Sequence, residues 1–220
     1  DDYEINEYTR NTPLEVENKN FSYNDTKEGD AIVVFSKKRV LEIAQSYSEK
    51  GIKASIIYGD LPPEVRKMQY AEFLNKETKV LVTTDAIGMG VNLPIRRIIF
   101  MSVSKYDGEE VRELTSQEVK QVAGRAGRKG IYDVGYVASI GGTQDLIKEK
   151  LEMKDKLIDK AVIGPSDAIL KIKNLPLNQK LALWKDRKES LDYYTKMDIS
   201  EYLLILDRIK KYKLKEIDQW

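Results

Sequence analysis

The residues best suited to chemistry lie in residues 121–128, with the sequence QVAGRAGR. Arg125 and Arg128 are three positions apart in a stretch kept open by glycines. Glycine lets the backbone approach a ligand closely, and arginine presents a planar fork of donors that matches phosphate oxygens. Phosphoryl transfer needs such charges because its transition state spreads negative charge over the γ-phosphate. The segment therefore predicts contacts with a triphosphate; the alternative is a solvated basic turn at the end of a helix.

A second candidate segment covers residues 80–94, where an apolar run leads into hydroxyl groups, a carboxylate and glycines. Ligands of open α/β sheets bind at the carboxyl ends of strands, so a polar turn after a buried strand is a favoured place for a site. The third glycine of a dinucleotide-binding motif is missing, which argues against that class of site. An ordinary turn after a strand is the alternative. The positions concerned are Thr83, Thr84, Asp85, Gly88 and Gly90.

Two weaker candidates follow other predicted strands. Ser36 and Lys37 come directly after the apolar run 31–35, where a hydroxyl, backbone amides and a cation together suit a phosphate at the start of a helix. Gly59 follows the run 54–58 in the same way. Taken alone, Ser36 is also a plain N-cap and Gly59 a plain turn residue.

Several kinds of site are missing from the sequence. The chain has no cysteine and no histidine, which excludes disulfides, thiol nucleophiles, Ser-His triads and His or Cys metal sites. We predict no metal ligands within this chain; a carboxylate-bound Mg²⁺ is the alternative that this composition leaves open. No glycine is followed by lysine, so there is no P-loop, and no Asp-Glu pair is present to hold Mg²⁺. The chain has candidate arginines for a triphosphate but nothing to hold it, which indicates half of an enzyme.

The elements that must position these residues alternate between strand and helix. Each predicted strand is nearly all apolar, which favours a parallel α/β sheet covered by helices on both faces. The Lys-rich residues 146–220 predict a smaller all-α region. An apolar helical stripe in it is either core or a docking face, and its residues are Ile199, Tyr202, Leu203, Leu206 and Ile209. We therefore predict a linker or incoming strand over 1–30, the α/β domain over 31–145 and the helical region over 146–220. Predicted strands are 31–35, 54–58, 79–84, 97–101 and 135–140; predicted helices are 38–50, 63–75 and one opened by the capping box at 115–118.

Composition sets limits on partners and location. The 220 residues carry a net charge of +1, but residues 1–30 hold 9 acids and 3 bases, while the rest holds 27 acids and 34 bases. This balance permits a nucleic-acid partner without requiring one. The longest uncharged run, residues 134–144, has 11 residues and is too short to cross a membrane. The acidic start lacks a signal-peptide pattern. The absence of cysteine fits a cytoplasmic or organelle-matrix location, which we expect, with no membrane partner.

In this order, the motifs resemble the second RecA-like domain of superfamily-two helicases over residues 30–141. Residues 35–37 look like motif IV, residues 83–92 like motif V and residues 121–128 like motif VI, whose leading Gln121 is similar to the DExH branch. Further segments look like the Suv-type RNA helicases of the mitochondrial degradosome and their bacterial relatives: 57–63, 84–93, 96–100 and 115–117. Residues 161–220 resemble the helical C-terminal region of that family only loosely.

The resemblance implies a role for each matching residue. Gln121, Arg125 and Arg128 would face the triphosphate, with one of the two arginines as the arginine finger. The nucleotide side of the cleft would be lined by Asp85, Gly88, Gly90 and Gly124. The phosphate backbone of RNA would be contacted by Ser36, Lys37, Gly59, Thr83 and Thr84.

The implied activity is that of the C-terminal motor lobe of an ATP-dependent RNA helicase, inactive when alone. Its partners would be single-stranded RNA, the N-terminal RecA-like lobe of the same protein and an exoribonuclease. ATP with Mg²⁺ would be bound mainly by that first lobe. Two alternatives stay open: a stand-alone nucleic-acid-binding module, and one lobe of a DNA helicase or translocase.

Overall fold

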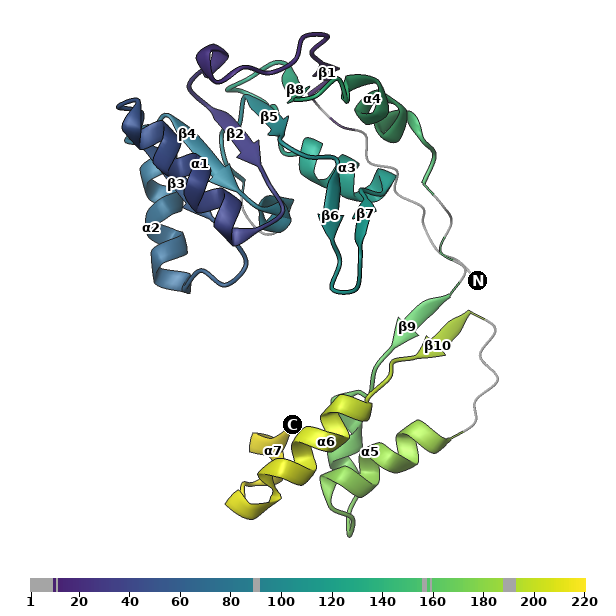
Figure 1. Ribbon diagram of the computed structural model, residues 1–220. Coiled ribbons are helices and arrows are strands. Elements are labelled where there is room, and N and C mark those ends of the chain that lie inside the picture. Colours follow the sequence, from purple (N-terminus) through teal and green to yellow (C-terminus); the bar gives the residue numbers. More distant parts are fainter. Residues whose placement is uncertain (1–9, 11, 89–91, 156–157, 159, 188–192) are drawn as a thin grey trace. The chain divides into compact units, whose positions relative to one another are not determined.

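The computed structural model describes residues 10, 12–88, 92–155, 158, 160–187 and 193–220 (Figure 1). The chain divides into two compact units, which meet in sequence between Asp155 and Lys156. Helix α4 (Gln144–Glu152) contacts helix α3 (Ser116–Ala123) and strand β1 (Leu14–Val16), so it lies in the first unit. The three-part domain division drawn from the sequence stays a prediction.

The first unit is built on a six-stranded sheet in the order β1-β8-β5-β2-β4-β3. All neighbouring pairs in it are parallel, which confirms the predicted α/β sheet. Every residue of the central strands β2, β4 and β5 is buried, because helices cover both faces and leave no place for a solvated side. Besides β1, the strands are β2 (Asp30–Val33), β3 (Ala54–Ile57), β4 (Val80–Thr83), β5 (Arg97–Phe100) and β8 (Gly135–Ser139).

One face of the sheet is covered by α1 (Lys37–Glu49) and the segment around the short helix η1 (Tyr23–Asp25). Ser36 caps α1 by accepting the N–H of Arg39 at 3.3 Å, as its position after the strand predicts. The helix buries Val40, Ile43 and Tyr47 against the sheet. Helix α1 therefore begins at the carboxyl end of β2, where a ligand site is expected.

The other face of the sheet is covered by segments that include the predicted motifs V and VI. Helix α2 (Pro63–Leu74), the short helix η2 (Asp85–Gly88), α3 and α4 all contribute to one apolar cluster with the sheet. The predicted capping box at the start of α3 is confirmed: Thr115 accepts the N–H of Glu118 at 3.2 Å, and Glu118 accepts the N–H of Thr115 at 2.8 Å. Motif V, around η2, and motif VI, from α3 onward, thus pack on the same face.

A hairpin that the sequence analysis did not foresee precedes α3. Strands β6 (Ser104–Tyr106) and β7 (Val111–Glu113) pair antiparallel, with Lys105 opposite Arg112. Each strand has only three residues, too few for an alternating pattern to be recognised. The hairpin places two cations beside the start of α3.

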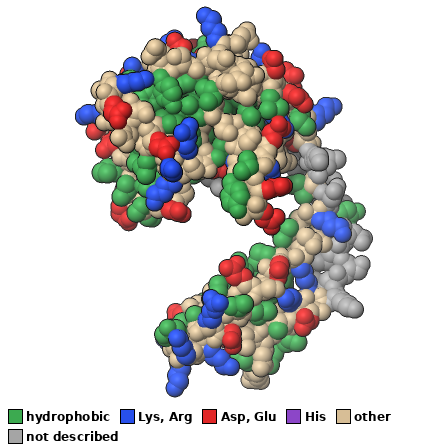
Figure 2. Space-filling model, viewed as in Figure 1, with side chains coloured by type: hydrophobic (Ala, Val, Ile, Leu, Met, Phe, Trp, Pro, Cys, Tyr) green, Lys and Arg blue, Asp and Glu red, His purple; other side chains and the backbone are tan. Residues whose placement is uncertain are grey.

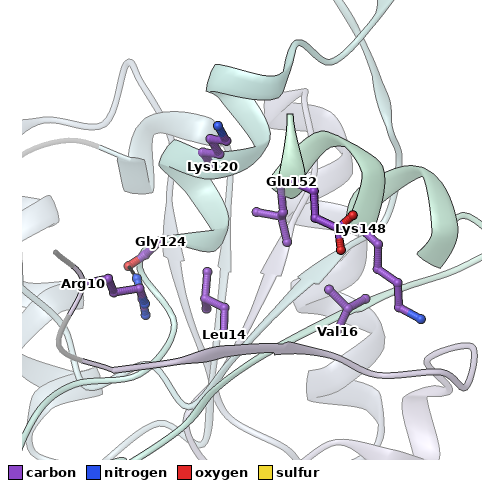
Figure 3. A pocket seen from close by; sticks show the side chains of 8 residues that line it. Arg10, Leu14, Val16, Lys120, Gly124, Lys148 and Glu152 are labelled. Atoms are coloured by element: carbon purple, nitrogen blue, oxygen red, sulfur yellow. Dashed lines mark hydrogen bonds between the residues drawn. The ribbon is translucent and has the colours of Figure 1, made fainter. Parts of the chain in front are cut away.

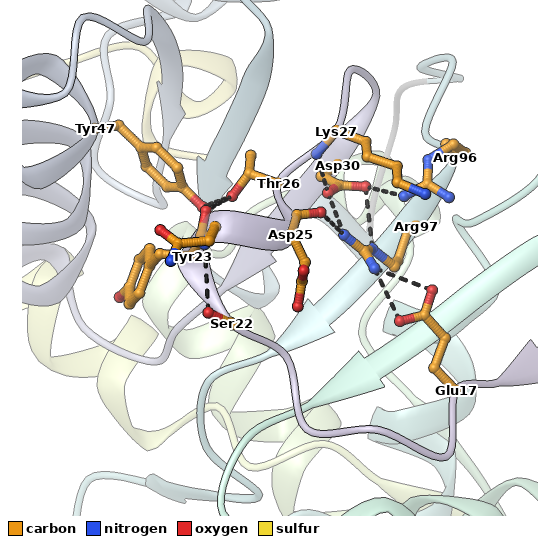
Figure 4. Close-up of polar contacts among 11 residues, drawn as sticks. Glu17, Ser22, Tyr23, Asp25, Thr26, Lys27, Asp30, Tyr47, Arg96 and Arg97 are labelled. Atoms are coloured by element: carbon orange, nitrogen blue, oxygen red, sulfur yellow. Dashed lines mark hydrogen bonds and ion pairs between the residues drawn. The ribbon is translucent and has the colours of Figure 1, made fainter.

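A buried ion network joins the amino ends of β2 and β5 (Figure 4). Asp30 is fully buried and accepts hydrogen bonds from Arg97 at 2.6 Å and 3.2 Å and from Arg96 at 2.8 Å. Arg97 also donates to both carboxylate oxygens of Glu17, at 3.0 Å and 2.8 Å, and to the carbonyl of Asp25 at 2.9 Å. A buried charge is tolerated only when it is paired in this way, so the network fixes the segment after β1 to the sheet.

The second unit is mainly helical but is not all-α, which corrects the prediction for this region. Strands β9 (Ala161–Ile163) and β10 (Tyr194–Lys196) form a short parallel pair that three-residue segments do not reveal in a sequence. Ile199 and Leu206 of the predicted apolar stripe are buried core, whereas Tyr202 is 46% exposed. The other elements are η3 (Asp167–Lys171), α5 (Leu177–Asp186), α6 (Ser200–Ile209), η4 (Lys210–Tyr212) and α7 (Glu216–Gln219).

Candidate nucleotide and nucleic-acid site

Residues 124–128, here called the arginine loop, are fixed against the sheet by backbone contacts. The N–H of Gly127 donates to the carbonyl of Ile95 at 2.8 Å. Gly127 has a φ of +76°, and a Cβ there would lie 2.6 Å from Thr12 Cγ2 and 2.8 Å from the backbone nitrogen of Gly135. Glycine is therefore required at this position both by the dihedral angle and by space. The loop cannot shift without disturbing the start of β8.

Arg10 adds a side-chain clamp that the sequence analysis missed (Figure 3). Its guanidinium donates to the carbonyl of Gly124 at 2.6 Å and also to the carbonyls of Ala126 and Thr12. Burial lowers the pKa of Arg10 from its usual value. A lone arginine outside any motif gives no signal in one sequence, because two of its three partners, the carbonyls of Gly124 and Ala126, are more than 100 residues away.

A cavity of about 520 Å³ opens beside this clamp, between β1, α3 and α4 (Figure 3). Leu14 and Val16 of β1 line it on one side, and Lys120 and Lys148 contribute cations. Lys148 donates to the side-chain oxygen of Asn18 at 2.9 Å, and Lys120 pairs with Asp155 at 2.9 Å. Both cations therefore already have protein partners.

The two arginines of the arginine loop are half-buried. Arg128 donates to the carbonyl of Asn92 at 3.0 Å, which joins motif VI to the end of motif V. Burial raises the pKa of Tyr70 on α2, and the charges of Arg66 and Arg125 act against that rise, so the Arg125 guanidinium lies near this helix. The hydrogen bond to Asn92 orients the Arg128 guanidinium, and a defined orientation is what a phosphate-binding fork requires.

A second cavity, of about 510 Å³, lies at the carboxyl ends of β2, β3 and β4; we call it the carboxyl-edge pocket. Parallel strands end at the same edge of a sheet, so the turns that follow them are expected to lie close together there. Lys37 extends its Nζ over the ring of Tyr58, 5.0 Å from the centroid. The pocket brings together six of the predicted site residues: Ser36, Lys37, Gly59, Thr84, Asp85 and Gln121.

Other predicted residues lie elsewhere. Thr83 is fully buried, and its hydroxyl donates to the carbonyl of Thr84 at 2.9 Å, so it secures the end of β4. Gly88 ends η2, and Gly90 lies outside the described residues. Asp85, predicted on the nucleotide side, shares the carboxyl-edge pocket with the predicted phosphate contacts.

A chain of charges connects the pocket to the hairpin. Lys105 donates to Asp85 at 3.0 Å and forms an ion pair with Glu118 at 2.7 Å. Arg112 donates to both carboxylate oxygens of Glu118, at 2.9 Å and 3.0 Å. The hydrogen bonds from Arg112, followed by that from Lys105, hold the pKa of Glu118 far below its usual range. Lys105 and Arg112 were missed from the sequence because their partners become neighbours only through the fold.

The described residues contain no group of three or more His, Cys, Asp or Glu side chains placed to hold a metal ion. In the same part of the chain, no helix has the length and apolar character needed to span a membrane. The carboxyl-edge pocket combines hydroxyls, cations and carboxylates: Ser36 and Thr84, Lys37 and Lys105, and Asp60, Asp85 and Glu118. Its hydroxyls and cations are groups that suit an anion such as a phosphate.

A parallel sheet with polar turns at its carboxyl edge and an arginine loop beside one helix defines a ligand-binding α/β domain. A protein family described as "Helicase conserved C-terminal domain" matches residues 15–130 of this sequence, and the chain belongs to that family. The predicted resemblance to Suv-type helicases is confirmed by the relatives that follow.

Among curated proteins, mitochondrial ATP-dependent RNA helicase SUV3 of Candida albicans is 46% identical over 129 residues, covering 58% of this chain and 18% of that protein. SUV3 of Saccharomyces cerevisiae is 38% identical over 175 residues, covering 75% of this chain and 24% of that protein. The mitochondrial helicase DExH18 of Arabidopsis thaliana is 32% identical over 219 residues, covering 93% of this chain and 27% of that protein. The chain thus spans about a quarter or less of the length of these relatives.

Among solved structures, the C-terminal domain of the DEAD-box protein Dbp5 matches with a TM-score of 0.47 and 17% sequence identity. The match covers 90% of this chain and 97% of that one.

Proposed function

We propose that this chain is the C-terminal motor lobe of an ATP-dependent RNA helicase. One observation carries the proposal: helix α3 places Gln121 in the carboxyl-edge pocket and then runs into the arginine loop. Helix α3 therefore links the carboxyl-edge pocket to the two arginines, so one rigid element can respond to both RNA and nucleotide. Gln121, for which the resemblance implies a role toward the triphosphate, lies where the two sites meet. The names of the relatives, all ATP-dependent RNA helicases, support the same assignment.

On the nucleotide side, Arg125 and Arg128 act as the candidate arginine fingers, with Gly124 allowing close approach. ATP, when bound, supplies a triphosphate whose charge these guanidinium groups face. As the resemblance implies, the metal and most of the nucleotide are held by the N-terminal RecA-like lobe. Gly88 is proposed to line the nucleotide side, and the role of Gly90, which lies outside the described residues, stays a prediction from the resemblance.

On the RNA side, the carboxyl-edge pocket takes the phosphate backbone of single-stranded RNA. Ser36 and Thr84 supply hydroxyls, Lys37 a cation and Gly59 an open backbone at the pocket. Binding led by phosphates is weakly sequence-specific and weakens as salt is raised. Of the two predicted locations, the organelle matrix has the support of the relatives, which are named as mitochondrial. The exoribonuclease partner stays a prediction from the resemblance.

RNA-stimulated ATP hydrolysis, measured on this chain and on the complete product of the same gene, tests the proposal. We expect the complete product to hydrolyse ATP and this chain alone to be inactive. Hydrolysis by the chain alone would contradict the half-motor assignment. Hydrolysis by neither would favour the stand-alone binding module, and preference for single-stranded DNA over RNA in competition would favour the DNA helicase.

A further inference from the structure

Lys105 occupies a position that neither the motifs nor the proposed function explains. It lies at the centre of β6, with a side chain 18% exposed, and lines the carboxyl-edge pocket. Its Nζ lies 3.0 Å from Asp85 Oδ2 and 2.7 Å from Glu118 Oε1. One cation thus contacts two carboxylates that line the same pocket.

The two carboxylates depend on Lys105 to different degrees. Glu118 also accepts two hydrogen bonds from Arg112 and one from the N–H of Thr115 at 2.8 Å, so it stays neutralised without Lys105. Asp85 has no other ion pair in the described part of the chain. Loss of Lys105 would therefore leave Asp85, not Glu118, as an uncompensated charge.

An uncompensated carboxylate matters here because the pocket is not strongly basic. Its lining includes the carboxylates of Asp60, Asp85 and Glu118 and the cations of Lys37 and Lys105. Charged side chains of both signs are interspersed over the visible surface (Figure 2), and the net charge is only +1. The potential felt by a phosphate is therefore set by the nearest charges, which act strongly at separations of a few ångströms.

We propose that Lys105 is a positioning residue that neutralises Asp85 and so keeps the carboxyl-edge pocket open to an RNA phosphate. The inference rests on the proposed function, since it deepens the RNA side of that assignment. Lys105 acts through Asp85 and does not touch the RNA. The hairpin β6–β7 is then the element that delivers this charge to the pocket.

A double-mutant cycle tests the proposal. Binding of a fluorescent single-stranded oligouridylate is measured by anisotropy at low salt for the wild-type chain, Lys105→Met, Asp85→Asn and the double variant. We expect Lys105→Met to bind about tenfold more weakly, the size of one charge exposed near a phosphate. The double variant is expected to bind within about twofold of Asp85→Asn alone, because the charge that Lys105 neutralises is then absent.

Lys150→Met is the matched control. Lys150 is 17% exposed and pairs with Glu113 of the same hairpin at 2.5 Å, but it does not line the pocket. We expect its RNA affinity to equal that of the wild type. Lys105→Arg, which keeps the charge, should also bind normally, and a melting temperature for each variant separates a loss of folding from a loss of affinity.

Three outcomes overturn the inference in distinguishable ways. If Lys105→Met lowered the RNA affinity equally in the wild type and in the Asp85→Asn variant, Lys105 would contact RNA directly. Unchanged affinity in Lys105→Met would mean that Asp85 needs no neutralisation; both results leave the proposed function standing. Failure of the wild-type chain to bind the oligouridylate would instead remove the RNA site itself, and this inference with it.

Discussion

The guanidinium of Arg10 donates to the carbonyl of Gly124 at 2.6 Å, although the two residues are 114 positions apart. The same side chain also donates to Ala126 and Thr12. The segment before β1 therefore holds the arginine loop from outside the helicase motifs. Fixed geometry of this kind is what a transition-state contact requires, since small displacements of a charged group cost much of its effect.

Arg10→Ala is expected to loosen the arginine loop without unfolding the domain. Hydrogen bonds from a charged donor are lost, so the free energy of unfolding should fall by about 1–2 kcal/mol in chemical denaturation. RNA-stimulated turnover of the complete protein should fall more than its RNA affinity. The exposed Lys19→Ala serves as the control and should match the wild type in both assays; a turnover in Arg10→Ala equal to the wild type would show that the loop does not need the clamp.

Gly127→Ala should destabilise the first unit by about 3 kcal/mol or more, because a Cβ meets the backbone of Gly135 and the dihedral angle is unfavourable. Gly130→Ala is a matched control with a φ of +85° and no atom within 4 Å of the added Cβ. It should cost only about 1 kcal/mol. Urea denaturation of both variants measures the difference, and equal costs would contradict the close packing described for Gly127.

Asp30→Asn should be among the most damaging changes outside the site. It leaves the Arg97 guanidinium, 4% exposed, without its nearest charge partner, and breaking a buried pair costs about 3–5 kcal/mol. Glu42→Gln removes a carboxylate from surface pairs with Lys38 and Arg39 and should cost less than about 1 kcal/mol. Thermal and denaturant unfolding compare the two; a small cost for Asp30→Asn would mean that the network is not needed for folding.

The depressed pKa of Glu118 predicts a pH dependence of stability. Arg112 and Lys105 hold the ionised form in the folded state, whereas the unfolded chain titrates near the usual value of 4.5. Stabilisation by this group is therefore complete above about pH 4.5 and is lost as the pH falls toward the folded-state pKa. Glu118→Gln should be less stable at neutral pH and show a flatter decline below pH 4.5; parallel curves for the two proteins would contradict the assignment.

Local patterns were enough to predict most of the first unit. The apolar runs around β2 and β4, the N-cap Ser36 and the capping box at Thr115 each depend on neighbours in sequence, and all are confirmed. The rule for strand ends also predicts which turns meet, and the carboxyl-edge pocket gathers them.

What the sequence did not reveal depends on distant pairs or very short elements. Asp30 and Arg97 are 67 positions apart, and Lys105 meets Asp85 only because the hairpin folds back onto η2. Strands of three residues, such as β9, carry no periodicity to recognise. Such features arise from tertiary packing, which one sequence without its fold does not display.

The arginine loop is proposed to supply positive charge to the transition state of ATP hydrolysis. The most direct test measures kcat for RNA-stimulated hydrolysis by the complete protein carrying Arg125→Ala or Arg128→Ala, with the exposed neighbour Lys129→Ala as control. At least one arginine variant is expected to lose about 1,000-fold or more in kcat while its RNA affinity and melting temperature stay close to those of the wild type. Near-normal turnover in both arginine variants would contradict it.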